Sequence, residues 1–194
     1  MESKRFILAS ASPRRSEILK NAGFDFDVIV SDADETLPEN ITAEKAVLWL
    51  SKIKAESVSK KNPGCVVLGC DTVVCLDGKI LGKPKTKEEA FRMLSALSGK
   101  VHKVYTGVTV TDGVKTESLL SESSVEFFPL SDKTVRSYIE TEEPMDKAGA
   151  YGIQGFGCVL VKRIDGDYFS VMGLPISESA RVLSRFGIKG RTDL

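Results

Sequence analysis

The sequence has little of what most metal-binding, membrane-spanning or nucleic-acid-binding proteins require. Its 194 residues include one histidine and four cysteines, and no two cysteines form a Cys-x-x-Cys pair, so a structural zinc site is not expected. No apolar run reaches the ~18 residues of a membrane-spanning helix. Basic and acidic residues each number 27, and this zero net charge argues against a general binder of nucleic acid or membrane surfaces.

Several familiar signatures are also missing. No Gly-x-x-x-x-Gly-Lys-Ser/Thr sequence is present, and Gly152-Ile-Gln-Gly155-Phe-Gly157 does not fit the Gly-x-Gly-x-x-Gly pattern of dinucleotide-binding folds. The single histidine, His102, gives no credible Ser/His/Asp triad and is expected to be structural. These absences exclude the commonest phosphate-binding loops and serine hydrolases.

An N-terminal targeting signal is not expected either. The polar segment from Ser10 to Arg15 interrupts the first apolar stretch before it reaches the length of a signal-peptide core. A cytoplasmic location is therefore the default expectation. Cys65, Cys70 and Cys75 lie in or beside apolar runs and are expected to be buried, reduced thiols.

The order of predicted elements indicates an α/β protein with a mixed sheet, in one domain over residues 1–194. Strands and helices alternate early, and long strands follow that are joined by the turn signals Asp77-Gly78 and Asp112-Gly113. Strands are predicted at 5–9, 26–30, 65–75, 79–82, 101–111, 116–128 and 157–164. Helices are predicted at 13–22, 42–60, 86–97, 131–140 and 175–186. Residues 141–157 contain Pro144 and four glycines, and such a long irregular segment is often functional.

The start of the first predicted helix indicates an anion site. Ser12 and Pro13 are typical of an N-cap and a first helical residue. Arg14 and Arg15 then lie in the first turn, where the helix dipole disfavours each cation by a few tenths to about 1 kcal/mol. Free N–H groups, the dipole and two guanidinium groups together favour a bound phosphate or carboxylate. Alternatively, both arginines are solvated or pair with nearby acids.

Asp71 is the one carboxylate in the strongly apolar run 65–74. Carboxylates rarely occupy such strands without a partner or a chemical role. Near a strand end in an α/β sheet, such a residue often faces the ligand crevice. It is a candidate metal ligand or general base, or else it caps a turn or pairs with a lysine.

Three further charged residues are less distinctive. Glu35 ends the acidic cluster 32–35, for which a solvated loop is the ordinary interpretation, and Asp34 is an adjacent candidate for any role given to it. Lys54 borders the apolar face of its predicted helix, and Lys83 lies in the stiff turn Leu81-Gly-Lys-Pro84. Single lysines of this kind are usually solvated.

Taken together, these segments resemble the Maf family of nucleoside triphosphate pyrophosphatases. The matching pieces follow the family order along nearly the whole chain. They are Leu8-Ala-Ser-Ala-Ser-Pro-Arg-Arg15, Gly69-Cys-Asp-Thr-Val-Val74, Leu81-Gly-Lys-Pro84, Leu97-Ser-Gly-Lys-Val-His102, Glu143-Pro-Met-Asp-Lys-Ala-Gly-Ala-Tyr-Gly-Ile-Gln-Gly155, Ile164-Asp-Gly-Asp-Tyr168 and Val171-Met-Gly-Leu-Pro175.

The resemblance implies a fold and a reaction. The implied fold is a two-lobed, curved mixed sheet flanked by helices, similar to inosine triphosphate pyrophosphatases, with the active site in the cleft and often a homodimer. The implied reaction is hydrolysis between the α and β phosphates, which gives a nucleoside monophosphate and pyrophosphate. Residues 146–154 resemble the branch that prefers dTTP and UTP, with CTP and modified pyrimidine nucleotides as further candidates. The alternative is a nucleotide-binding regulator of septum formation with little turnover.

Carried over by matching position, the resemblance also implies roles for individual residues. Asp71 corresponds to the proton acceptor, and Arg14, Thr72 and Gln154 correspond to residues that set substrate preference. The expected catalytic set is Asp71, Glu35, Lys54 and Lys83. The expected substrate-binding set is Ser10, Arg14, Arg15, Thr72 and Gln154. Glu35 and Asp71 are the expected ligands of a divalent cation, Mg²⁺ or Mn²⁺.

Overall fold

The computed structural model describes residues 4–192 and centres on a seven-stranded sheet with the order β2-β1-β3-β5-β6-β7, in which β4 also pairs with β3. Strand β1 runs parallel to β2 and β3, and every other pairing is antiparallel, so the sheet is mixed as predicted. The strands are β1 (Phe6–Leu8), β2 (Asp27–Val28), β3 (Val66–Leu76), β4 (Lys79–Leu81), β5 (Val101–Thr111), β6 (Thr116–Phe127) and β7 (Val161–Asp165).

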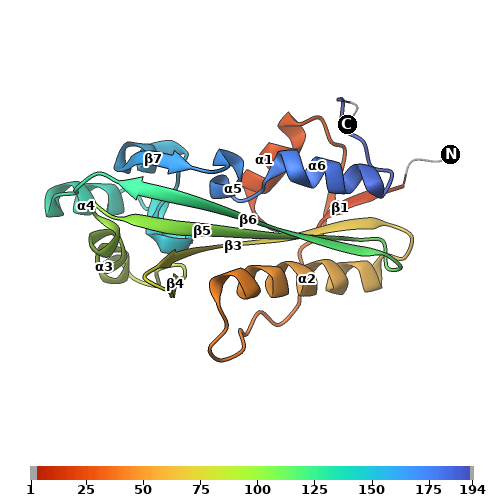
Figure 1. Cartoon of the computed structure of the whole chain (residues 1–194), viewed down its shortest axis with the longest axis horizontal. Helices are drawn as coiled ribbons and strands as arrows, with labels where there is room; N and C mark the ends of the chain where they lie inside the picture. The colour runs from red at the N-terminus through yellow and green to blue at the C-terminus, as the bar shows by residue number, and fades with distance from the viewer. Residues whose placement is uncertain (1–3, 193–194) are drawn as a thin grey trace.

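Helices cover both faces and both ends of this sheet (Figure 1). Helix α2 lies along one face, α1, α5 and α6 gather on the other face towards one end, and α3 and α4 lie at the opposite end. The α-helices are α1 (Pro13–Asn21), α2 (Ala43–Lys61), α3 (Lys87–Leu97), α4 (Asp132–Ile139), α5 (Tyr168–Met172) and α6 (Ile176–Arg185). Short 3₁₀ helices are η1 (Glu143–Asp146), η2 (Ala148–Ala150) and η3 (Gly155–Leu160). No helix within residues 4–192 is long and apolar enough to cross a membrane.

Two large hydrophobic clusters divide the sheet lengthwise into two lobes. The α1/α6 cluster includes Leu68 of β3 and Val108 of β5, whereas the α3/α4 cluster includes Val74 of β3 and Val104 of β5. The same strands therefore contribute one end to each cluster. The residues of β3 that lie between the two ends are the ones that face the boundary between the lobes.

Helix α2 approaches the sheet closely because two glycines lie beneath it. A Cβ atom on Gly69 would lie 2.2 Å from the carbonyl oxygen of Ser51, and one on Gly107 would lie 2.4 Å from that of Val47. Gly107 is paired with Asp71 across β3 and β5. This close approach therefore lies directly beside Asp71.

Both predicted hairpin turns are present. Asp77 and Gly78 join β3 to β4, and both have positive φ angles, +49° and +77°, as the tight hairpin turn requires. At the β5–β6 connection, one carboxylate oxygen of Asp112 accepts hydrogen bonds from the N–H groups of Val114 and Lys115, at 3.1 and 2.9 Å.

The strand predicted at 157–164 is wrong in its first half. The chain forms η3 up to Leu160 and becomes β7 only at Val161. Two glycines permit the turns of η3. Gly155 has a φ of +70°, and a Cβ on Gly157 would lie 2.3 Å from the carbonyl oxygen of Gly152. The prediction also missed helix α5, although Asp167 caps it by accepting a 3.0 Å hydrogen bond from the N–H of Phe169.

The four cysteines are free thiols, and two of the three predicted to be buried are buried. Cys65 and Cys70 are buried, but Cys75 is only partly covered because it lies near the β3–β4 turn. Burial raises the pKa of the Cys70 thiol to about 11, so this group stays protonated at neutral pH.

Candidate active site

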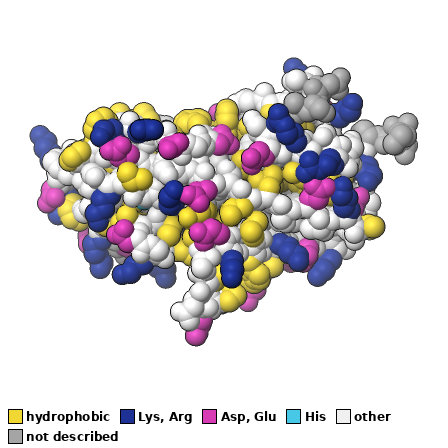
Figure 2. All heavy atoms as spheres, in the orientation of Figure 1, with side chains coloured by type: hydrophobic (Ala, Val, Ile, Leu, Met, Phe, Trp, Pro, Cys, Tyr) yellow, Lys and Arg dark blue, Asp and Glu magenta, His cyan; other side chains and the backbone are white. Residues whose placement is uncertain are grey.

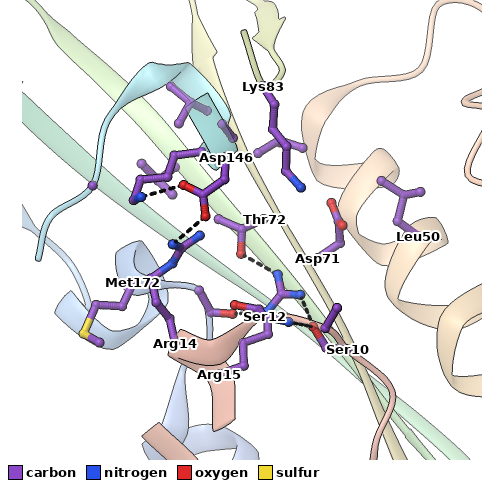
Figure 3. Close-up of a pocket in the computed structure, with 18 of the residues that line it drawn as sticks. Ser10, Ser12, Arg14, Arg15, Leu50, Asp71, Thr72, Lys83, Asp146 and Met172 are labelled. Carbon is purple, nitrogen blue, oxygen red and sulfur yellow. Dashed lines mark hydrogen bonds and ion pairs between the residues drawn. The ribbon is translucent and has the colours of Figure 1, made fainter. Parts of the chain in front are cut away.

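A cavity of about 490 Å³ lies at the boundary between the lobes, over the middle of β3 (Figure 3). The cavity is lined by the β1–α1 segment, α2, β3, the turn after β4, residues 146–154 and α5. Every predicted site residue lines it, namely Ser10, Arg14, Arg15, Glu35, Lys54, Asp71, Thr72, Lys83 and Gln154. The structure thus brings together side chains that are scattered over most of the sequence.

Asp71 lies at the centre of β3, so its expected position near a strand end is wrong. It nevertheless faces a crevice because both neighbours on this side of β3 stop short of it. The pairing of β1 with β3 ends at Leu68, and the pairing of β4 begins at Val74. The gap in the sheet edge between these two residues forms the floor of the cavity.

Lys54 bridges two carboxylates at this floor. Its ammonium nitrogen lies 2.7 Å from Oδ1 of Asp71 and 2.9 Å from Oε2 of Glu35. The side chains of Lys54 and Asp71 are 11% and 15% exposed, whereas that of Glu35 is 51% exposed. Lys54 is thus a nearly buried counter-ion rather than the solvated surface lysine that its sequence context favours.

Glu35, and not its neighbour Asp34, faces this lysine. Oδ1 of Asp34 accepts hydrogen bonds from the N–H and the hydroxyl of Thr36, at 2.9 and 2.7 Å. These two bonds lower the pKa of Asp34 below its ordinary value. Of these two neighbouring acids, Asp34 therefore orders its own loop and Glu35 reaches the site.

Arg15 is held by three protein acceptors. It donates to the carbonyl oxygen of Gly173 at 2.9 Å, to the hydroxyl of Ser10 at 2.9 Å and to the hydroxyl of Thr72 at 3.3 Å. A guanidinium group has five N–H bonds, so some remain for a ligand. The arginine that was predicted to bind an anion also fixes two other predicted site residues.

The Thr72 hydroxyl has a fixed hydrogen-bond direction. Thr106 donates to the carbonyl oxygen of Ser170 at 2.9 Å and lies 2.9 Å from the Thr72 hydroxyl. Because a carbonyl can only accept, the Thr106 proton is committed and Thr72 must donate to Thr106. Thr72 can therefore offer only a lone pair to a molecule in the cavity.

Arg14 is paired with an acid from the other lobe, as Figure 3 shows. One of its guanidinium nitrogens lies 3.3 Å from Asp146, whose other oxygen accepts a 2.6 Å bond from Lys147. Burial acts to raise the pKa of Asp146, but the bond from Lys147 and the charges of Lys147 and Arg14 outweigh it, and the pKa is lowered. Asp146 is thus an anion that already occupies the predicted anion site.

Two lining side chains have no such partner. Among the described residues, neither the Lys83 ammonium nor the Gln154 amide makes a hydrogen bond or ion pair. Figure 3 shows Lys83 pointing into the cavity. The cationic lining residues Arg14, Arg15, Lys54, Lys83 and Lys147 outnumber the anionic ones, Glu35, Asp71 and Asp146. The cavity therefore has a net positive charge and free donors for an anion.

The outer surface differs from this cavity. Figure 2 shows that lysine, arginine and acidic side chains are interspersed over the face that it presents, without a continuous area of one sign. A basic stripe of the kind that follows a nucleic-acid backbone is not seen on this face. The local positive charge of the cavity is instead suited to a small anionic molecule.

The donor set fits a cation that arrives with a phosphate ligand. Within residues 4–192, no three side chains of His, Cys, Asp or Glu converge as metal ligands. Asp71 and Glu35 each use one oxygen on the shared Lys54 ammonium, Oδ1 and Oε2, and the second oxygen of each carboxylate remains for a cation. Mg²⁺ is typically held by one or two carboxylates together with substrate phosphates, and two converging carboxylates match that pattern.

Sequence reasoning missed Asp146, Lys147 and Thr106 as members of this site. The first two lie in the motif Glu143-Pro-Met-Asp-Lys147, so the motif itself was a usable signal. Thr106 gave none, because a threonine in a predicted strand is ordinary. Its role depends on β3 and β5 lying side by side.

Comparison with known proteins agrees with this geometry. The profile of the family described as "Maf-like protein" matches residues 5–186. A protein of Bacillus pumilus named "dTTP/UTP pyrophosphatase" is 50% identical over 184 residues, which cover 95% of this chain and 97% of that protein. One of Fusobacterium nucleatum with the same name is 51% identical over 186 residues, which cover 94% and 96%.

The fold has a solved counterpart as well. The structure titled "Structure of a HAM1 protein from Coxiella burnetii" matches 94% of this chain and 99% of that one, with a TM-score of 0.56 at 17% identity. At this identity the likeness concerns the fold alone, and it agrees with the predicted resemblance in architecture. The match of the family profile over nearly the whole chain, together with relatives of about half identity, shows that this chain belongs to the Maf-like protein family.

Proposed function

We propose that this protein hydrolyses nucleoside triphosphates, with dTTP and UTP preferred, between the α and β phosphates. The products would be a nucleoside monophosphate and pyrophosphate. The observation that carries the proposal is the Lys54-bridged pair of Asp71 and Glu35 at the floor of a net positive cavity. The names of the relatives supply the substrate class.

Asp71 is the proposed general base. Lys54 contacts Oδ1 and fixes the orientation of the carboxylate, so that the other oxygen can accept a proton from the attacking water. Asp71 and Glu35 would also hold Mg²⁺ or Mn²⁺ together with phosphate oxygens. When bound, such a cation supplies neutralisation of the phosphate charge and polarises the scissile bond.

Arg14 and Lys83 are the proposed phosphate-binding cations, with Ser10 and Arg15 beside them. Lys83 has no partner to give up within the described part of the chain, whereas Arg14 has to exchange Asp146 for phosphate. Both stabilise the charge that moves onto the pyrophosphate leaving group. The bidentate geometry of a guanidinium group suits phosphate oxygens better than a point charge does.

Gln154 and Thr72 are the proposed base-reading residues. A glutamine amide both donates and accepts, which matches the imide edge of uracil or thymine. The Thr72 hydroxyl can only accept, since its proton is committed to Thr106. An acceptor complements the imide N–H of uracil and thymine and does not complement the unprotonated ring nitrogen of cytosine.

We further propose that residues 1–194 form one Maf-like domain, because β3, β5 and β6 are shared between the lobes. A cytoplasmic location is proposed on the ground that nucleoside triphosphates are made and used there. Assembly into a homodimer stays a prediction that a mass measurement in solution would test.

The test is an assay of the purified protein with Mg²⁺ and a panel of normal and modified triphosphates, in which monophosphate and pyrophosphate are measured separately. We expect both products in equal amounts, fastest from dTTP and UTP. Asp71→Asn should lower kcat by about 10²–10⁴-fold, as loss of a general base does. Asp77→Asn is the matched control, because it removes a carboxylate from the same strand's turn, where asparagine tolerates the positive φ.

Two results would contradict the proposal. If Asp71→Asn keeps nearly the parental kcat, Asp71 is not the base. If no triphosphate in the panel is hydrolysed while nucleotides still bind, the chain is the nucleotide-binding regulator that the sequence left as the alternative.

A further inference from the structure

We infer that Glu143 is a positioning residue for base recognition: its carboxylate fixes the segment Gly152–Gly157 and thereby aims Gln154 into the cavity. The inference rests on the proposed function of Gln154 as a base-reading residue. Glu143 itself lies outside the cavity lining and touches none of the residues at its floor.

One carboxylate and one phenol hold the whole segment. Oε1 of Glu143 accepts from the Tyr138 hydroxyl at 2.9 Å and from the N–H of Gly157 at 3.0 Å, and Oε2 accepts from the N–H of Phe156 at 2.8 Å. The Tyr138 hydroxyl in turn accepts from the N–H of Gly152 at 3.0 Å. Backbone groups on both sides of Gln154 are therefore tied to the same pair.

The segment is shaped to wrap around this carboxylate. A Cβ atom on Gly155 would lie 2.4 Å from Oε2 of Glu143, and one on Gly157 would lie 2.6 Å from the Tyr138 oxygen. Gly155 also has a φ of +70°, which favours glycine. The glycines remove the side chains that would keep the backbone away from the carboxylate.

Every group that faces the Glu143 carboxylate is a donor. Burial raises the pKa of Tyr138, so its hydroxyl keeps its proton and donates to Glu143. The other two contacts are backbone N–H groups, which can only donate. A carboxylate accepts all three bonds, whereas the amide of a glutamine would place an NH₂ group against at least one donor.

The amide of Gln154 depends on this backbone for its direction. Within the described residues it has no hydrogen-bond partner of its own. The chain before it crosses between the lobes, since Tyr151 packs in the α3/α4 cluster and Ile153 in the α1/α6 cluster. Loss of the Glu143 contacts would free the segment after this crossing, while Asp71 and Lys54 would keep their positions. Base selectivity should then weaken before the chemical step does.

The experiment compares Glu143→Gln and Tyr138→Phe with the matched control Glu142→Gln, an exposed neighbour with the same loss of charge. KM and kcat are measured for UTP and CTP, and amide hydrogen exchange is followed over residues 152–157. We expect both variants to raise the KM for UTP about 10-fold and to reduce the UTP-to-CTP ratio of kcat/KM by a similar factor. This is the effect expected from the loss of about one hydrogen bond to a charged group. The kcat for UTP should stay within about threefold, exchange over residues 152–157 should accelerate, and the control should match the parent.

Gln154→Ala separates failure of the inference from failure of the proposed function. If Gln154→Ala changes the UTP-to-CTP ratio and the Glu143 and Tyr138 variants do not, the inference is overturned and the proposed function stands. A uniform fall in kcat for both substrates at an unchanged ratio also overturns it, because that is the result of a general structural defect. If the parental protein hydrolyses neither substrate, the proposed function fails first. Should Glu143→Gln not fold, Tyr138→Phe decides alone, since it removes a single oxygen atom.

Discussion

At the scale of single residues, the charged groups of the cavity are already paired with one another. Lys54 contacts two carboxylates, and Arg14 contacts Asp146. A phosphate that enters therefore exchanges with acids that are present, and Lys83 is the one cationic side chain of the lining without a partner in the described part of the chain. This arrangement keeps cations in position at the boundary between the lobes without leaving them uncompensated in a partly buried site.

The sequence made some of these residues predictable and left others invisible. Asp71 could be predicted because a carboxylate rarely lies in an apolar strand without a partner or a chemical role. Arg14 could be predicted because cations oppose the dipole at a helix start. The pairing of Asp146 with Arg14 could not be predicted, since the two residues are 132 positions apart in the chain, and only the motif Glu143-Pro-Met-Asp-Lys147 marked Asp146 at all. The same holds for Glu143, whose role depends on the turns of a glycine-rich segment.

His102 is expected to make the stability of this protein sensitive to mild acid. It is buried beside Tyr151, with Nε2 2.8 Å from the phenol oxygen, and burial lowers its pKa to about 4. The unfolded chain binds this proton near pH 6.5, so between pH 6.5 and pH 4 the unfolded state binds more protons than the folded state. The free energy of unfolding should therefore fall as the pH is lowered, by about 2 kcal/mol between pH 7.5 and pH 5.

Urea unfolding at both pH values, for the parent and for His102→Gln, measures this contribution. The variant is expected to be less stable at pH 7.5 but to lose about 2 kcal/mol less on acidification. Parallel losses in the two proteins would show that other groups cause the acid sensitivity.

At the scale of elements, helix α2 is the part on which the site depends most. It carries Lys54, and it reaches Asp71 only because Gly69 and Gly107 let its backbone lie against the sheet. The sequence did not show which element either glycine approaches, because glycine within a strand pattern only suggests that some close approach exists. The helix itself, by contrast, was predicted to within one residue at each end.

Gly107→Ala is expected to push α2 away from the sheet. The new Cβ would lie 2.4 Å from the carbonyl oxygen of Val47, which is backbone and cannot rotate away. We expect a loss of about 1–3 kcal/mol in the free energy of unfolding, as overpacking gives, together with a lower kcat, because Lys54 and Asp71 are drawn apart. Urea unfolding and the pyrophosphate assay measure the two effects.

Gly82→Ala is the control for the stability part of this experiment. A Cβ on Gly82 would meet no atom within 4 Å, so the variant should stay within about 0.5 kcal/mol of the parent. If Gly107→Ala is equally harmless, the close approach of α2 is not a constraint on the fold.

At the scale of the whole molecule, the cavity joins the two lobes. Its lining includes Arg14 at the start of α1, Lys54 on α2 and Lys83 after β4. A triphosphate that contacts all three binds the folded state alone, and at 100 times its Kd it stabilises by about 2.7 kcal/mol. For a chain of this size that corresponds to a rise in Tm of roughly 5–10 °C.

A non-hydrolysable UTP analogue with Mg²⁺ should therefore raise the Tm by several degrees more than UMP at the same concentration. Thermal unfolding at a series of ligand concentrations measures the difference. An equal rise with UMP would mean that the cations contact only the first phosphate, and the proposed role of Lys83 and Arg14 in binding the leaving group would be wrong.

Strands β3, β5 and β6 run without interruption from one hydrophobic cluster into the other. In hinge closure around a ligand, two rigid domains rotate about a few loop residues that join them. Within residues 4–192, the three paired strands offer no such hinge between the lobes, because a sharp bend would break the ladder of hydrogen bonds that joins them. The segments at the rim of the cavity, residues 31–37 and 146–157, would therefore have to close around a ligand. The rates of opening and of product release should depend on these loops and not on motion of one lobe against the other.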